Sequence, residues 1–224
     1  MKVAVHQPNY LPYLGFIDKA KKSDIFVIYD DAQFSKGDWH NRNKIRTPNG
    51  WAWLTIPVKK HPDKSKINEI LINNDIWWHK KHLKSIDSFY SKTKNYNIYK
   101  ERINSIYSKN FVRLIDLNMA IIDFFWDAFS IKSKLILSSN LNINSSSTSK
   151  LIDIMTSVGG DTYISGDGAE DYLEFDLFIK KGIEVELQNF THPQYKQNFQ
   201  GFEPNMSALD ALFNIGPDIN FKDV

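Results

Sequence analysis

Residues 2–16 read KVAVHQPNYLPYLGF, and this stretch decides how the rest of the chain can fold. An apolar run of β-branched residues begins at Lys2 and breaks at Pro8, and the residues from Leu14 to Lys22 predict a helix. A strand, a loop and a helix in this order make up the first part of an α/β unit. Polar residues in such a loop lie at the carboxyl end of the strand, where α/β proteins place their sites.

A second apolar run, from Ile25 to Tyr29, follows this helix and predicts a second buried strand. It gives way to two adjacent carboxylates, Asp30 and Asp31. Two strands about twenty residues apart with a helix between them form a right-handed parallel βαβ unit. We therefore expect the two strands to be parallel neighbours, with His6 on the same rim of the sheet as the two aspartates.

Length and composition limit what the protein can be. The 224 residues are 42% hydrophobic, which is enough for the core of one α/β domain spanning residues 1–224. A net charge of +2 provides no field that would recruit nucleic acid or a membrane surface, so we expect a small-molecule partner. The absence of cysteine excludes disulfides, thiolate zinc sites and a Cys nucleophile. Without a signal-like start or an apolar run of about twenty residues, the sequence predicts a cytoplasmic protein with no membrane insertion. Its oligomeric state stays open.

The central part of the chain predicts a hairpin and then helices. The segment Ile45–Val58 has the pattern of a β-hairpin that turns at Asn49-Gly50. Residues 61–73 suggest a loop followed by a short strand, and Asn74-Asp75 a helix N-cap. Helical periodicity then predicts a helical insert at about 75–130.

The remainder of the chain returns to the α/β pattern. Short strands and helices alternate in it, and the loop Ser165-Gly166 follows one of the strands directly. The fold class predicted is therefore α/β, with a mainly parallel, Rossmann-like sheet. The elements expected are a strand at 135–137, a helix ending near 158, a strand at 162–164, a helix at 176–181, a strand at 183–190 and a helix within 202–216.

Six short motifs occur in order along the chain: HQPNYLP at 6–12, DDxQF at 30–34, NRNxI at 41–45, YISG at 163–166, DYL at 171–173 and SxLDxLFNxG at 207–216. Together they resemble the WbqC-like family. Members of that family are similar to proteins encoded with O-antigen and other surface-polysaccharide genes. The resemblance implies a place in cell-surface polysaccharide biosynthesis and specifies no reaction; a nucleotide-sugar substrate is our hypothesis within that pathway.

A second resemblance concerns the first 34 residues, which are similar to the start of pantothenate synthetase and other nucleotidylyl transferases. Those folds hold ATP with a His-x-Gly-His turn. Here Tyr10 and Tyr13 stand where the two histidines would fall, and Pro12 stands in place of the glycine. The chain therefore lacks that signature.

The catalytic candidates are His6 and Asp31. A His that leaves a strand at a loop suits a general base with a pKa near 6.5, or a ligand for a substrate hydroxyl, although such a His is also commonly bonded to backbone. Adjacent strand residues point to opposite faces, so one of Asp30 and Asp31 is expected in the site; turn chemistry is the alternative. The predicted substrate-binding residues, which we expect to meet in one pocket, are Gln7, Asn9, Tyr10, Asp30, Gln33, Asn41, Arg42, Asn43, Ser165 and Gly166.

The cationic and metal-binding patterns of the sequence each have a structural alternative. Arg42, Lys44 and Arg46 alternate along one arm of the hairpin and could present three cations to a diphosphate, but the same alternation is normal for a half-exposed strand. The segment Ser145–Lys150 could bind an anion before a helix, but an ordinary N-cap is favoured. His79 and His82 are surrounded by lysines, which favours a solvated face over a metal site, and no metal is predicted.

Three function classes follow. The first is an enzyme that acylates or aminoacylates the amine of a nucleotide-linked amino sugar. The second is a nucleotidylyl transferase with a degenerate signature, and the third is a non-catalytic sugar-binding or scaffold protein. The sequence leaves the cofactor unknown, with ATP and acyl-CoA as the two possibilities.

Overall fold

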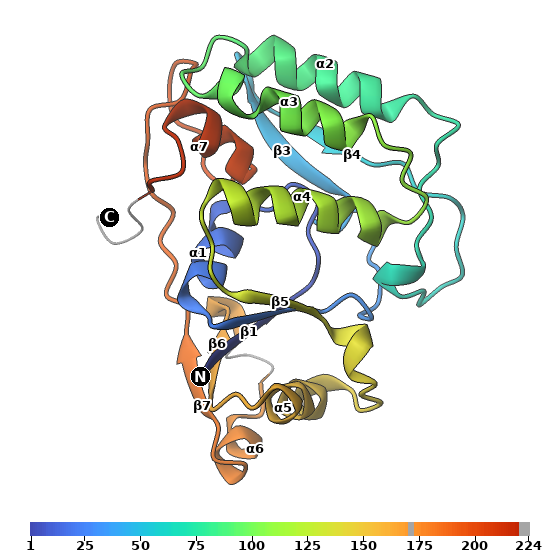
Figure 1. Ribbon diagram of the computed structural model, residues 1–224, viewed down its shortest axis with the longest axis vertical. Helices are drawn as coiled ribbons and strands as arrows, with labels where there is room; N and C mark the ends of the chain where they lie inside the picture. Colours follow the sequence, from blue (N-terminus) through green and yellow to red (C-terminus); the bar gives the residue numbers. More distant parts are fainter. Residues whose placement is uncertain (170–172, 220–224) are drawn as a thin grey trace.

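A computed structural model describes residues 1–169 and 173–219 (Figure 1). Its centre is a sheet of five strands in the order β5-β2-β1-β6-β7, and every neighbouring pair is parallel. The predicted parallel α/β fold is therefore confirmed, and β1 and β2 are neighbours with Val3 opposite Ile25. The strands are β1 (Lys2–His6), β2 (Ile25–Ile28), β5 (Lys134–Leu137), β6 (Thr162–Ser165) and β7 (Glu184–Leu187).

Helices cover both faces of this sheet (Figure 1). Ala4 and Phe26 pack in one apolar cluster with α1 (Leu14–Lys22) and α4 (Leu114–Ala128). Val3 and Val5 belong to a second cluster with α5 (Ser147–Val158) and α6 (Phe175–Lys180). Burial on both faces explains why these strands are continuous apolar runs and do not alternate with polar residues.

The connections change direction between β1 and β6. From β1 the chain passes through α1 to β2 and then to β5, all on one side of β1. It returns through α5 to β6, which lies against the other side of β1. The carboxyl ends of two strands that part in this way flank a crevice, and open α/β sheets bind ligands there.

A hairpin and four helices form a layer on the α1 side of the sheet (Figure 1). The hairpin is confirmed and turns at Gly50, whose φ of +114° favours glycine. The predicted helical insert at about 75–130 is confirmed as α2, α3 and α4. The elements not yet named are β3 (Arg42–Thr47), β4 (Gly50–Thr55), α2 (Trp78–Tyr90), α3 (Tyr96–Tyr107), α7 (Ala208–Asn214), and the 3₁₀ turns η1 (Ile67–Glu69), η2 (Ser138–Leu141) and η3 (Asp167–Ala169).

A buried polar network joins the hairpin to the C-terminal helix. Asp210 accepts hydrogen bonds from Tyr90 Oη at 2.8 Å, Tyr195 Oη at 2.7 Å and Gln197 Nε2 at 2.9 Å. Arg46 is only 2% exposed and donates through Nε to Gln197 at 3.1 Å and through a guanidinium nitrogen to the Gly50 carbonyl at 2.7 Å. Arg46 therefore does not join Arg42 and Lys44 in presenting three cations to a diphosphate, because its guanidinium donates to carbonyls of its own fold.

Two local expectations are also wrong. Residues 61–73 contain the turn η1 and isolated bridges, such as Val58 with Ile72, and no strand. Asn74-Asp75 is not an N-cap, because α2 begins at Trp78. Asn74 instead donates to the Phe111 carbonyl at 2.8 Å and accepts from the Trp78 indole at 3.2 Å. The side chain expected to cap the helix is therefore engaged in these two contacts.

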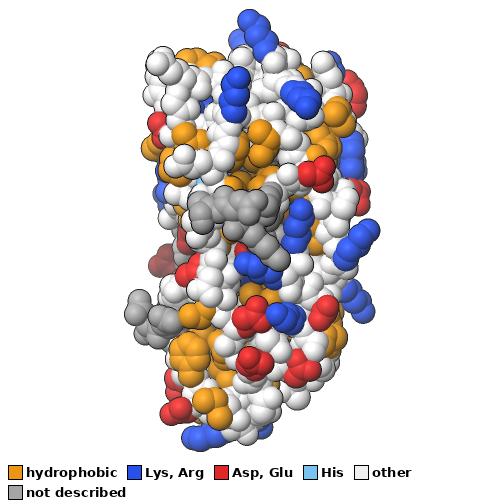
Figure 2. Space-filling view, turned by 90° about the vertical axis from the view of Figure 1, so that its left-hand side faces the viewer, with side chains coloured by type: hydrophobic (Ala, Val, Ile, Leu, Met, Phe, Trp, Pro, Cys, Tyr) orange, Lys and Arg blue, Asp and Glu red, His pale blue; other side chains and the backbone are white. Residues whose placement is uncertain are grey.

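The surface agrees with the small net charge. Figure 2 shows basic and acidic side chains interspersed over one face of the molecule and not gathered into a patch of one sign. Within the two described ranges, no helix is long and apolar enough to cross a bilayer.

Candidate functional site

A cavity of about 470 Å³ opens at the carboxyl ends of β1 and β6, where the chain direction changes. We call it the switch-point cavity. Its wall includes His6, Gln7, Tyr13, Lys19, Gly166 and Asp167.

A second cavity of about 300 Å³ lies beside the first, and we call it the adjacent cavity. Its own wall is formed by Asn9, Asp38, Trp39 and Asn205. Both cavities are also lined by the same three residues, His6, Gln7 and Tyr13. Two ligands bound side by side would therefore meet at these three side chains.

His6 is held as a neutral imidazole. Its Nδ1 lies 2.8 Å from the Gln7 carbonyl, which can only accept, so Nδ1 carries the proton and Nε2 keeps a lone pair. The ring also meets the edge of Phe16 at 4.9 Å between centroids. Burial, and secondarily the charge of Lys19, lowers the pKa of His6 to about 3. The ordinary pKa expected from the sequence is therefore wrong for the protein without a ligand, because the strand pattern does not reveal what surrounds the ring.

Gln7 is oriented by a second histidine. His40 donates from Nε2 to Gln7 Oε1 at 2.8 Å, while its Nδ1 accepts from the Ser35 amide at 3.3 Å. Burial lowers the pKa of His40, which keeps this ring neutral and its tautomer fixed. The amide oxygen of Gln7 is thus occupied, and its NH₂ group is left to donate to a ligand.

Tyr13 stands immediately before α1, and its ring packs over the first turn of that helix. A Cβ on Gly15 would lie 2.4 Å from the Tyr13 ring and 3.0 Å from the ring of Phe190. Only glycine allows the ring to come this close to the helix backbone. The fixed ring forms part of the wall that both cavities share.

Lys19 is one of the wall residues that are missing from the sequence-predicted set, together with Tyr13, Asp38, Trp39, Asp167 and Asn205. It lies inside α1, is only 5% exposed and lines the switch-point cavity. Burial lowers its pKa to about 8, against the opposing influence of Asp167. A signal was present, because Asp18 and Lys19 interrupt a helix whose residues from Leu14 to Ala20 are otherwise apolar or small. A charged pair inside so apolar a helix is a sign of a specific partner.

The two aspartates after β2 have structural partners. Asp30 is buried and accepts from the amide of Ser139 at 3.0 Å, from the Ser139 hydroxyl at 2.7 Å and from Asn68 at 3.1 Å. Asp31 forms an ion pair with Lys150 and accepts from the hydroxyl of Ser138. Burial acts to raise the pKa of Asp31, but these hydrogen bonds outweigh it and lower the pKa.

The sequence-predicted set is only partly brought together. His6, Gln7, Asn9 and Gly166 line the two cavities, and Ser165 is buried next to them. Other members make contacts elsewhere: Tyr10 bonds to His82 at 2.8 Å, and the amides of Asn41 and Asn43 donate to the carbonyls of Ile56 and Leu11. Neither cavity is lined by Tyr10, Asp30, Asp31, Gln33, Asn41, Arg42 or Asn43.

Arg42 and Gln33 remain outside the cavities for visible reasons. The Arg42 guanidinium packs on the ring of Trp53 at 4.2 Å, and Gln33 is exposed and bridged to Lys66. The Ser145–Lys150 segment begins α5, with Ser146 as its N-cap residue, and Lys150 is committed to Asp31. Asp171 and Tyr172 of the DYL motif lie outside the described residues. In the described part of the chain, no three His, Cys, Asp or Glu side chains cluster as metal ligands would.

The sheet order defines a Rossmann-like α/β protein, and two adjoining cavities lie at its switch point. The model of the WbqC-like protein family matches residues 7–220, and the chain belongs to that family. It is also 33% identical over 220 residues to a Mycobacterium tuberculosis protein described as "Uncharacterized protein Rv1507c", an alignment that covers 97% of this chain and 95% of that protein. No solved structure matches the chain.

Proposed function

We propose that the protein is an enzyme of cell-surface polysaccharide biosynthesis that forms an amide on the amine of a nucleotide-linked amino sugar. The observation that carries this proposal is the pair of cavities sharing His6, Gln7 and Tyr13. A transfer between two small molecules needs two binding sites that meet at one point, and a single-ligand binding protein does not.

The adjacent cavity has the chemistry of an amino-sugar site. An indole such as that of Trp39 packs against the apolar face of a sugar ring. The Asp38 carboxylate suits a sugar ammonium, and the amides of Asn9 and Asn205 suit its hydroxyls. The acyl or aminoacyl donor would then occupy the switch-point cavity.

His6 is the group between the two ligands. The nucleophile is the neutral sugar amine, which attacks the acyl carbon; the amide C–N bond forms, the donor's leaving group departs, and the nitrogen loses a proton. The Nε2 lone pair of His6 would accept that proton or orient the amine by a hydrogen bond. Because the imidazole of the ligand-free protein is a weak base, we expect His6 to raise turnover mainly by orienting the amine.

Nucleotidylyl transfer is less well supported. The position that would hold the first signature histidine is Tyr10, and its hydroxyl is engaged by His82 and Tyr107 in the core. It lines neither cavity, and Tyr13, in the place of the second histidine, brings a phenol and not an imidazole to the site, so the histidine pair of that reaction has no counterpart here.

Product analysis tests the proposal. The purified protein would be incubated with a nucleotide-linked amino sugar and either acyl-CoA or an amino acid with ATP, and the amide would be detected by mass spectrometry. We expect His6→Ala to lower turnover while its melting temperature stays near that of the wild type. Thermal stabilisation by the sugar with no amide from either donor would support the binding-protein alternative and contradict catalysis.

A further inference from the structure

Lys19 is a buried cation whose ammonium forms no ion pair with the described residues. Its side chain is only 5% exposed, and no ion pair or hydrogen bond joins its ammonium to another residue in the described parts of the chain. Removing a charge from water without a partner is costly, so a protein that keeps one has a use for it. The cavity beside this ammonium is the place from which a partner could come.

The acidic groups near Lys19 are already engaged. Asp167 accepts the backbone amides of Asn189 and Phe190, the latter at 3.0 Å. Asp18, one residue before Lys19, is paired with Lys22 at 2.8 Å. Neither carboxylate is within ion-pair distance of the Lys19 ammonium, although Asp167 attracts it from farther away, so a close partner for the charge could come from a ligand.

The loop after β6 leaves room for that ligand. A Cβ on Gly166 would lie 3.5 Å from Lys19 Nζ, so a larger side chain at this position would take space next to the ammonium. The hydroxyl of the preceding Ser165 is also buried without a hydrogen-bond partner. Of these two polar groups, only the Lys19 ammonium lines the cavity and can meet a ligand there.

We propose that Lys19 binds a phosphate group of the ligand that occupies the switch-point cavity. The carboxyl ends of strands at a topological switch point are where folds of this type hold nucleotide phosphates, and a phosphate supplies a negative charge with which the Lys19 ammonium could form an ion pair. The binding of a phosphate by Lys19 does not depend on the proposed function. Only the identity of the nucleotide that carries the phosphate rests on that proposal. A carboxylate could pair with Lys19 in the same way, and the experiment distinguishes the two anions by comparing acetate with phosphate.

The experiment measures melting temperature in inorganic phosphate, pyrophosphate or acetate, with ionic strength held constant by potassium chloride. In the wild type, phosphate or pyrophosphate should raise the melting temperature by about 3 °C or more. Lys19→Met should melt several degrees higher than the wild type without any anion, because a lone buried charge is gone, and it should lose the phosphate response.

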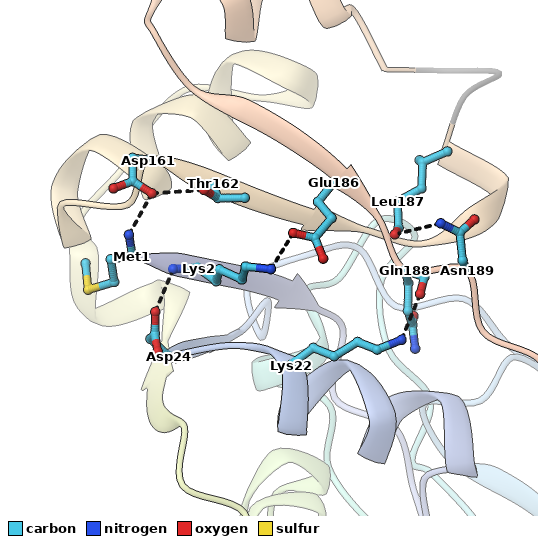
Figure 3. Close-up of polar contacts among 10 residues, drawn as sticks. All are labelled: Met1, Lys2, Lys22, Asp24, Asp161, Thr162, Glu186, Leu187, Gln188 and Asn189. Carbon is cyan, nitrogen blue, oxygen red and sulfur yellow. Dashed lines mark hydrogen bonds and ion pairs between the residues drawn. The ribbon is translucent and has the colours of Figure 1, made fainter. Parts of the chain in front are cut away.

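Lys22→Met is the matched control, because Lys22 lies on the same helix but has partners. Lys22 pairs with Asp18 and donates to the Gln188 carbonyl at 2.9 Å, as Figure 3 shows for the latter contact. Its loss should lower the melting temperature and leave the phosphate response intact. The exposed Lys84→Met serves the same purpose if Lys22→Met does not fold.

Four results would overturn the inference. Two of them are that the wild type does not respond to phosphate or pyrophosphate, and that the phosphate response persists in Lys19→Met. The other two are that the phosphate response is lost in the control variant, and that only acetate gives a response that depends on Lys19. Failure of amide formation would count against the proposed function but not against a phosphate response that depends on Lys19. The two proposals can thus fail separately.

Discussion

Lowering the pH from 7 to 5 should destabilise this protein through histidines whose pKa values are lowered in the folded state, chiefly His6 and His82. Burial is the main cause that lowers the pKa of His6 to about 3 and that of His82 to about 4. In the unfolded chain both would titrate near 6.5. Between these values the unfolded state binds protons that the folded state does not, so stability is complete above pH 6.5 and is lost as the pH falls below it. Integrated from pH 7 to pH 5, the loss is about 2 kcal/mol for each histidine, or about 4 kcal/mol together.

Urea unfolding at the two pH values measures this loss. A domain whose total stability is roughly 5–15 kcal/mol would show it as a large shift in midpoint. The variant His6→Asn should lose about half of the pH dependence, because His82 remains buried and bonded to Tyr10. A change smaller than about 1 kcal/mol between pH 7 and pH 5, or an equal change in His6→Asn, would refute the reasoning.

Three further outcomes are expected. Asp31→Asn should cost about 3 kcal/mol in urea unfolding because it leaves Lys150 as an unpaired buried cation, and adding Lys150→Met should restore most of that loss. Gly15→Ala should destabilise the protein and weaken ligand-induced thermal shifts, although Ala is the better helix former, because its Cβ would displace the Tyr13 ring. In Lys19→Met the pKa of His6 should rise in an NMR titration, since one of the charges that lowers it is gone; an unchanged or lower value would contradict the coupling.

The sequence was sufficient for the sheet because the sheet depends on local patterns. Continuous apolar runs at Val3 and Ile25, a short helix between them and glycine-marked turns each favour one arrangement, and these signals agree with one another. The helix Leu14–Lys22 has the predicted bounds. The bounds of α2 did not follow, because Asn74 could cap the helix or bond to Phe111, and only the packed structure decides between them.

The site was less accessible to sequence reasoning because polarity does not reveal what a side chain faces. Asn41, Asn43 and Arg46 look like ligand-binding residues, yet they satisfy buried carbonyls of their own fold. Lys19 looks like a solvent-facing helical lysine, yet it lines the cavity. Position along a strand was enough to place His6 and Gly166 at the same edge of the sheet, since parallel strands bring their carboxyl ends together.

Lys19 and His6 are coupled, and that coupling gives the site an order of events. The charge of Lys19 is one reason why His6 is so weak a base in the free protein. On the assignment proposed above, a phosphate beside Lys19 would offset that charge, and the pKa of His6 would rise once the cavity is filled. The imidazole would then become a better proton acceptor only after the phosphate-bearing ligand is in place. An amine arriving first would meet an imidazole that can orient it but is too weakly basic to take its proton, so reaction would depend on both cavities being occupied.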